Sequence, residues 1–203
     1  ERLWDLVAEA GEPHGLTPFG QIALLMARIE AGLLLIHVDF DVSRLAENDE
    51  HRSTPIELGL GWMLTTIDDD SRPFVGRHAI RRERAEGTSR WKMMGLMVDP
   101  YDYHRKYTDA GMVPPKDHTP VEEDMMLYDA DGERAGWASS FMYSPMLQRH
   151  IALARVLRAV TRVERDTRRY GGRDAAPEFH VAFIVQRQPD RFGGQLTALQ
   201  ARP

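Results

Sequence analysis

The first part of the chain alternates between helical and extended patterns of apolar residues. Residues 1–10 repeat apolar side chains every three or four positions, which predicts a helix. A second helix is predicted over 17–29, because Thr17 precedes a proline and suits the N-cap position. The apolar runs 33–40 and 60–67 predict extended segments or strands, separated by a polar loop.

A charged helix is predicted over 77–86. It follows a polar stretch, 68–73, that has the composition of a turn. Gly87 is typical of the residue that ends a helix. We expect Ala79 and Ile80 to face the core.

The second part of the chain has the pattern of a small antiparallel sheet. Residues 91–98 are apolar on both faces and predict a buried strand. Segments 125–128 and 134–139 flank an Asp-Ala-Asp-Gly sequence whose turn chemistry predicts a hairpin. Residues 148–156 predict one more strand. Residues 101–120, which include a glycine and three prolines, predict a long loop.

Composition narrows the class of protein. The chain has no cysteine, which excludes disulfides, thiolate metal ligands and a cysteine nucleophile. The overall charge is −5, and residues 155–203 hold ten arginines against five acidic residues, so the remainder lacks the cationic face that duplex nucleic acid requires. The longest aliphatic run, 33–36, is too short to cross a bilayer, and no signal peptide is visible. We therefore expect a cytoplasmic protein that binds neither nucleic acid nor membrane.

Several short segments follow one another in an order and at spacings that are specific as a set. They are Arg28-Ile29-Glu30-Ala31-Gly32-Leu33, Thr54-Pro55 with Glu57 and Gly59-Leu60-Gly61-Trp62, Phe74-Val75-Gly76-Arg77, Gly95-Leu96-Met97-Val98-Asp99, Tyr143-Ser144-Pro145-Met146-Leu147 and Ile151-Ala152-Leu153-Ala154. Over residues 1–155 this set resembles the C-terminal half of the glycine cleavage T-protein (aminomethyltransferase) family.

The resemblance implies an α+β fold in two parts. Residues 1–88 would be the end of the folate-binding T-protein domain. Residues 89–203 would be a small antiparallel β-barrel domain, with an atypical tail after about residue 156. The tail is either divergent sequence or the product of a reading-frame error near Arg155, and the second reading predicts a tail that packs poorly.

The resemblance also implies a function. The family binds tetrahydrofolate in a central cavity and transfers an aminomethyl or methyl group from a small-molecule donor to the folate. A true T-protein would also receive its donor from a lipoyl carrier protein. The family's catalytic Asp belongs to an N-terminal half that this sequence does not contain, so the catalytic residue here is unknown.

Two departures from the family pattern favour a divergent folate-dependent methyltransferase or demethylase over glycine cleavage itself. Leu24 stands where the family usually has an arginine that is associated with folate binding. A leucine cannot hydrogen-bond a carboxylate. Residues 101–119 are an insertion relative to the short linker of T-proteins.

Six residues are the candidates for folate or substrate binding: Glu30, Arg28, His37, Asp39, Trp62 and Tyr143. Glu30 and Arg28 would face the folate cavity, or form a polar helix end and a salt bridge. His37 and Asp39 would share one face of the extended segment, as an acid–base pair or as a structural hydrogen-bonded pair. Trp62 would stack on the pterin or pack in the core.

Tyr143 would approach the cavity or form a structural corner. The residue types of a metal site also occur in the predicted loop, but without ligand spacing, so we expect a solvated loop and no metal: Asp102, His104, Asp109, Asp117 and His118.

Two alternatives to an active transferase remain. The first is a folate-binding module without turnover, although the absence of cysteine argues against the iron–sulfur assembly branch. The second is an inactive fragment, since a cavity shared among three domains is incomplete without the first half. A fragment of that kind exposes apolar surface at the cut.

Overall fold

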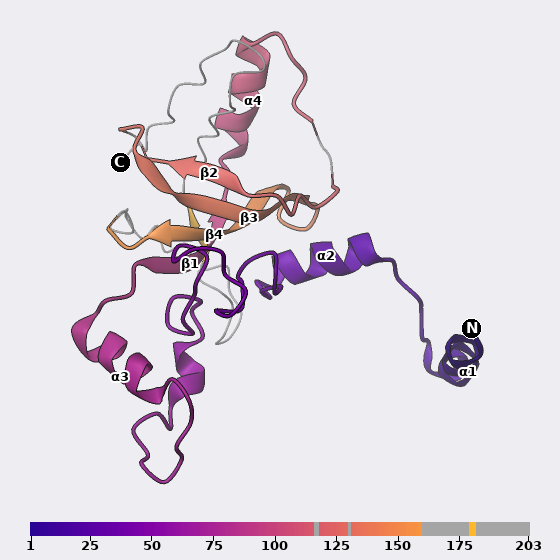
Figure 1. Ribbon diagram of the computed structural model, residues 1–203. Helices are drawn as coiled ribbons and strands as arrows, with labels where there is room; N and C mark the ends of the chain where they lie inside the picture. Colours follow the sequence, from indigo (N-terminus) through magenta and orange to yellow (C-terminus); the bar gives the residue numbers. More distant parts are fainter. Residues whose placement is uncertain (116–117, 130, 160–178, 182–203) are drawn as a thin grey trace.

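The protein is built around one five-stranded sheet. The computed structural model describes residues 1–115, 118–129, 131–159 and 179–181. The strands, in the spatial order β2-β3-β4-β1-β5, are β2 (Met125–Tyr128), β3 (Arg134–Ser144), β4 (Arg149–Leu157), β1 (Trp91–Met97) and β5 (Phe179–Val181). All pairs are antiparallel except β1 with β5, which is parallel. The predicted α+β class with a small antiparallel sheet is confirmed (Figure 1).

The predicted hairpin and the strands on either side of it are confirmed. The turn between β2 and β3 is built by Asp129, whose Oδ1 accepts hydrogen bonds from the backbone N–H of Asp131 at 3.0 Å and of Glu133 at 2.9 Å. β3 extends beyond the predicted 134–139, because it pairs with β4 as far as Ser144.

Gly136 is required by a close approach between strands. Its φ is 151°, and a Cβ at this position would lie 2.0 Å from the carbonyl oxygen of Arg155 on β4. Only a residue without a side chain allows β3 and β4 to pair here.

The core lies on both faces of the β3–β4 pair. One cluster of buried residues is Leu96, Leu127, Ala135, Ala138, Ala152, Ala154 and Val156. A second, on the side where α2 (Gln21–Glu30) packs, is Ile29, Met142, Ile151 and Leu153. The first cluster combines small alanines with large aliphatic side chains, whereas the second, under α2, contains only large ones.

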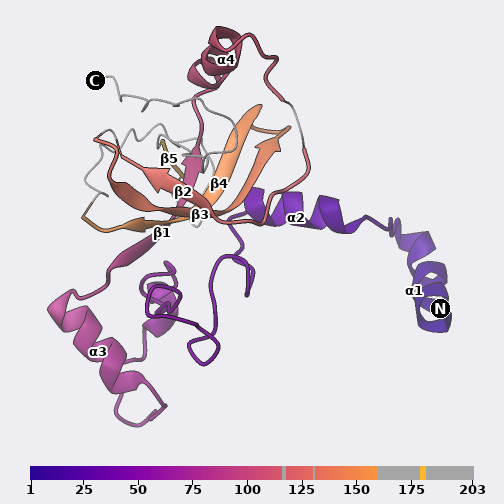
Figure 2. The ribbon, with the colours of Figure 1, turned by 45° about the horizontal axis from the view of Figure 1, so that its top comes forward.

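Two helices bear out their predictions in part. α1 (Arg2–Gly11) forms as expected. α2 begins at Gln21, not at 18, because Gly20 is still extended at ψ 167° and Thr17 donates to the carbonyl of Gly15 instead of capping the helix. Figures 1 and 2 show α1 standing away from the sheet at the end of an extended linker.

The predicted strands at 33–40 and 60–67 are wrong. Residues 31–40 form turns closed by an isolated bridge between Ile36 and Phe40, with His37 at φ 66°. In the second segment a short 3₁₀ helix, Gly61–Leu64, replaces the strand. Backbone i→i+3 hydrogen bonds satisfy these residues locally, so the apolar runs do not join the sheet.

α3 (Arg77–Glu86) has the predicted bounds but buries a different face. Ala79 is exposed and Ile80 only half-buried, whereas Arg77 and Glu83 are buried. The Arg77 guanidinium donates to the Ile67 carbonyl at 2.9 Å and also pairs with an aspartate. The orientation of this helix is therefore set by polar contacts with the preceding turns and not by burial of its apolar residues.

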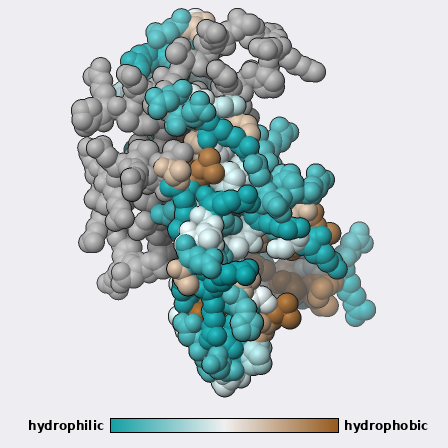
Figure 3. Space-filling model, turned by 60° about the vertical axis from the view of Figure 1, so that its left-hand side comes forward, coloured by the Kyte–Doolittle hydropathy of each residue, from teal (hydrophilic) through white to brown (hydrophobic). Residues whose placement is uncertain are grey.

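The predicted loop at 101–120 is wrong over its first half, which is α4 (Pro100–Asp109). Asp99 is the N-cap, accepting from the N–H of Tyr101 at 2.8 Å and of Asp102 at 3.0 Å, and Pro100 occupies the first helical turn. None of the helices in the described part is both long and apolar enough to cross a membrane. Figure 3 shows polar side chains over most of the described surface on the face it presents.

Candidate functional site

A pocket of about 180 Å³ lies where the 37–41 turn, the segment before β2 and the ends of β3 and β4 meet. Its lining residues are His37, Val38, Asp39, Phe40, Asp41, His51, Glu122, Asp124, Trp137 and Arg155. Pockets for small organic ligands typically hold about 300–1,000 Å³. This pocket is therefore smaller than typical sites for small organic ligands.

One wall of the pocket is held by a buried ion pair between Arg28 of α2 and Asp39. The Arg28 Nη1 lies 2.6 Å from the Asp39 Oδ2, and both side chains are almost fully buried. The other Asp39 oxygen accepts from the hydroxyls of Ser139 at 2.6 Å and Ser140 at 2.7 Å on β3. The Leu35 N–H adds a fourth bond at 2.7 Å. Asp39 is thus fully engaged in joining the turn to the sheet.

Arg28 also reaches the pocket's outer edge. Its Nη2 donates to the hydroxyl of Ser140 at 2.8 Å and to the carboxylate of Glu122 at 3.0 Å. Glu30, two residues along α2, accepts from the Ser144 hydroxyl at 2.5 Å and lies outside the pocket lining. Arg28 thus forms a salt bridge, and Glu30 is a hydrogen-bonded polar residue at the end of the helix. Both contacts are the structural alternatives considered for these residues.

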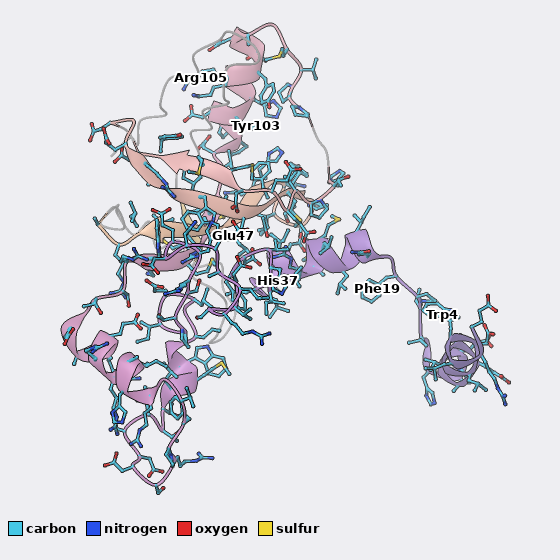
Figure 4. The ribbon with its side chains drawn as sticks, viewed as in Figure 1. Trp4, Phe19, His37, Glu47, Tyr103 and Arg105 are labelled. Carbon is cyan, nitrogen blue, oxygen red and sulfur yellow. The ribbon has the colours of Figure 1, made fainter. Side chains whose placement is uncertain are left out.

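His37 and Asp39 both line the pocket, but they do not share a face. His37 (labelled in Figure 4) has a positive φ, and its side chain is 55% exposed and lies 3.2 Å from Asp41. Asp39 is only 1% exposed and is turned towards α2 and β3. The alternation expected of an extended segment is therefore wrong here. His37 is the accessible member of the pair and Asp39 the structural one.

Trp62 and Tyr143 lie apart from the pocket. Trp62 belongs to the 3₁₀ helix and is 71% exposed, so its alternative reading as a core residue is wrong. Tyr143 points to the other side of the sheet, where its ring lies 5.2 Å from those of His118 and His150. The structure brings together Arg28, His37 and Asp39 of the six predicted site residues.

Arg155 is a site residue that sequence reasoning did not find. It is 2% exposed, and its guanidinium lies 4.8 Å from the Trp137 ring and 5.6 Å from the Trp91 ring. Its Nη2 donates to the Arg52 carbonyl at 2.8 Å. Burial lowers the pKa of this guanidinium from its usual value. Attraction to Glu57 acts in the opposite direction and is the smaller effect. Arg155 therefore fixes the loop around residue 52 against the sheet.

The open side of the pocket is acidic. Asp41, Glu122 and Asp124 line it beside His37 and His51. Burial raises the pKa of Asp124, and the charges of His51 and Arg155 oppose that rise. In the sequence, Glu122 and Asp124 belong to an unremarkable polar stretch. Their place at the pocket follows from the bridge between Val121 and Phe141 of β3, which no local pattern indicates.

The chain is similar to proteins of one family. The family model described as the glycine cleavage T-protein C-terminal barrel domain matches residues 110–173. An aminomethyltransferase of Bacteroides thetaiotaomicron is 34% identical over 100 residues, covering 49% of this chain and 24% of that protein. An aminomethyltransferase of Legionella pneumophila is 32% identical over 155 residues, covering 76% of this chain and 34% of that protein.

A further relative and a solved structure are also similar to this chain. A trimethylamine-oxide aldolase of Ruegeria pomeroyi is 34% identical over 156 residues, covering 76% of this chain and 16% of that protein. The crystal structure of the glycine cleavage system aminomethyltransferase T from Bartonella henselae aligns with a TM-score of 0.46 and 21% identity, over 66% of this chain and 30% of that one.

The matches define a class, the α+β proteins that carry a T-protein C-terminal barrel domain. Within it, the chain belongs to the glycine cleavage T-protein family, through that family's C-terminal region. The match to the first of these relatives spans about a quarter of the relative's length. The division at residue 88 stays a prediction, and the tail after 159 lies outside the described residues apart from β5.

Proposed function

We propose that this chain is the C-terminal part of a tetrahydrofolate-dependent transferase that moves an aminomethyl or methyl group from a small amine donor. The observation that carries the proposal is the run of similarity to aminomethyltransferases, which reaches 162 residues and 80% of this chain in a Geobacillus relative. The cytoplasm is the proposed location.

An amine donor suits the charge of the pocket. Among its lining residues Asp41, Glu122 and Asp124 outnumber the single cation Arg155, although Glu122 is paired with Arg28, and an excess of acidic groups raises the local concentration of cationic ligands. An alkylammonium donor is therefore favoured over an anionic one. The named activity of the Ruegeria pomeroyi relative, a trimethylamine-oxide aldolase, supports a donor that carries N-methyl groups. A lipoyl carrier protein would be a partner only if the donor is delivered as in glycine cleavage.

Tetrahydrofolate would need residues beyond those described. The pocket is smaller than typical small-molecule sites, and Leu24, in the place of the family's arginine, is a half-exposed hydrocarbon on α2. This chain contributes a fixed wall to the pocket, because the Arg28–Asp39 pair holds α2 and the 37–41 turn on the sheet.

Calorimetry with tetrahydrofolate tests the proposal. The chain is compared with a longer chain extended upstream in its gene. Binding by the longer chain alone supports a transferase whose folate site is shared between its parts. Binding by both, without turnover of dimethylamine or trimethylamine donors, favours the folate-binding module. Absence of binding by both refutes the folate-dependent function.

A further inference from the structure

A cluster of aromatic side chains joins α4 to the sheet. None of the residues of α4 is buried. Tyr103, on the first turn, places its ring centroid 4.3 Å from that of His150 on β4. Tyr107, one turn later, lies 4.9 Å from Tyr103. Figures 1 and 4 show α4 standing above the sheet, with Tyr103 at the part of the helix nearer to it.

His150 is the centre of this cluster. Its imidazole is stacked on Phe141 of β3 at 5.2 Å and 6°, and Tyr143 meets it edge-on at 5.2 Å. With Tyr103 from α4, three rings enclose an imidazole that is only 7% exposed. The helix is therefore docked on a side chain that can acquire a charge.

Within the described part of the chain, the charged groups that act on the pKa of His150 are His104 and His118, and both would repel a proton there. The titratable groups that face it are Tyr103 and His104 from α4, His118 from the segment after α4, and Tyr143 from β3. Burial lowers the pKa of His150 to about 4, and repulsion by His104 and His118 adds to the effect. Burial also raises the pKa of Tyr103, so that phenol remains neutral.

We propose that α4 is a pH-released flap, whose first turn is docked on the sheet through Tyr103 while the His150 imidazole is neutral, and which swings away when that imidazole takes a proton. The hinge is the capped end of the helix, where Asp99 holds the first N–H groups. Release uncovers the aromatic face formed by Phe141, Tyr143 and His150. The inference does not depend on the proposed transferase activity.

The size of the effect follows from proton linkage. A released His150 returns to the ordinary value of 6.5, while the docked one stays near 4. The docked state thus binds fewer protons, and its stability falls as the pH falls through this range. At pH 5 the ratio of docked to released flap is expected to be about 30-fold lower than at pH 8.

Spin labels can measure the position of the flap, because the chain contains no cysteine. Asp109→Cys at the end of α4 and Met146→Cys in the exposed β3–β4 turn carry one label each. We expect one narrow distance distribution at pH 8 and an additional broad population at pH 5. His150→Phe, which keeps an aromatic ring that cannot be protonated, should keep the narrow distribution at both pH values.

Two tyrosines of α4 provide a matched pair. Tyr103→Ala removes the docking ring and should broaden the distribution already at pH 8. Tyr101→Ala, at an 85% exposed position on the same helix, should leave it unchanged. An unchanged distribution at pH 5 in the labelled parent chain overturns the proposal. Equal broadening in the parent and in His150→Phe also overturns it.

A direct titration covers the case in which His150→Phe does not fold. The His150 imidazole of the unsubstituted chain is followed by NMR between pH 8 and pH 4. A midpoint near 6.5, as for an exposed histidine, overturns the proposal. A midpoint between 4 and 6.5, with the broad population growing over the same pH range, supports it, and a midpoint near 4 with an unchanged distance distribution overturns it.

Discussion

Arg28 and Asp39 form a buried ion pair, 2.6 Å between Nη1 and Oδ2, that links α2 to the turn at the wall of the pocket. Buried charges are costly unless every donor and acceptor is satisfied. Here the two serines of β3 and the Leu35 N–H complete the coordination of Asp39. The pair therefore holds the edge of the pocket in one arrangement.

Breaking that pair should be severely destabilising. Arg28→Ala leaves the Asp39 carboxylate buried without its cation, and we expect a loss of about 3–5 kcal/mol in the free energy of unfolding. Urea denaturation measures it. The control is Arg105→Ala, which removes an exposed pair with Asp102 and should cost less than about 1 kcal/mol. Similar losses in the two variants would contradict a special role for Arg28.

Gly136→Ala should disrupt the pairing of β3 with β4. The added Cβ would overlap the Arg155 carbonyl, which is backbone and cannot rotate away. We expect a cost of at least about 2–3 kcal/mol, measured by thermal unfolding. Gly61→Ala is the control, since no atom lies within 4 Å of a Cβ built there. A neutral Gly136→Ala would show that the strands separate easily at this point.

The stability of the whole chain should depend on His150. Its pKa is about 4 when folded and 6.5 when exposed, so its contribution is complete above pH 6.5 and is lost as the pH falls towards 4. We expect a loss on the order of 1–2 kcal/mol, below the full linkage value because the site is partly solvated. Urea midpoints from pH 8 to pH 4 test this. His150→Phe should flatten the profile, whereas His78→Gln, at an exposed position, should not.

Leu24→Arg should strengthen folate binding by the longer chain. It restores the donor that the family has at this position, and Leu24 is half-exposed, so an arginine fits without repacking. A charge-assisted hydrogen bond to a carboxylate contributes about 1.5–3 kcal/mol, which corresponds to at least a tenfold lower Kd by calorimetry. Leu24→Gln is the uncharged control. Equal affinities for Leu24 and Leu24→Arg would mean that α2 does not face the folate.

Local patterns predicted the sheet well and the turns poorly. The strands at 91–98 and 148–156 carry long apolar runs that pair with each other across the sheet, and the hairpin turn has its own signature in Asp129. The runs 33–40 and 60–67 are also apolar, but their backbones close local turns, and long-range contacts fix the first of these turns on the sheet. Asp39 illustrates this, because its hydroxyl partners lie 100 and 101 residues away.

The candidate site was predicted only where motif and geometry coincide. Arg28 was found because it belongs to a family-like stretch, and Asp39 because it alternates with apolar residues of the 33–40 run, yet both are engaged in structural contacts. Arg155 was missed because a single arginine in an apolar strand gives no sign that two tryptophans from other strands will enclose it. Glu122 was missed because the bridge before it depends on tertiary contacts alone.

The reach of Arg28 along the sequence has a consequence during synthesis. Its partner Ser140 follows 112 residues later, so at typical ribosomal speeds of about 5–20 residues per second the guanidinium waits roughly 6–22 s for that hydroxyl. Throughout that interval the C-terminal end of α2, including Ile29, has no β3 or β4 to bury it. The nascent chain therefore passes through a window in which this helix is available to chaperones, and the window closes only when the last hairpin of the sheet leaves the ribosome.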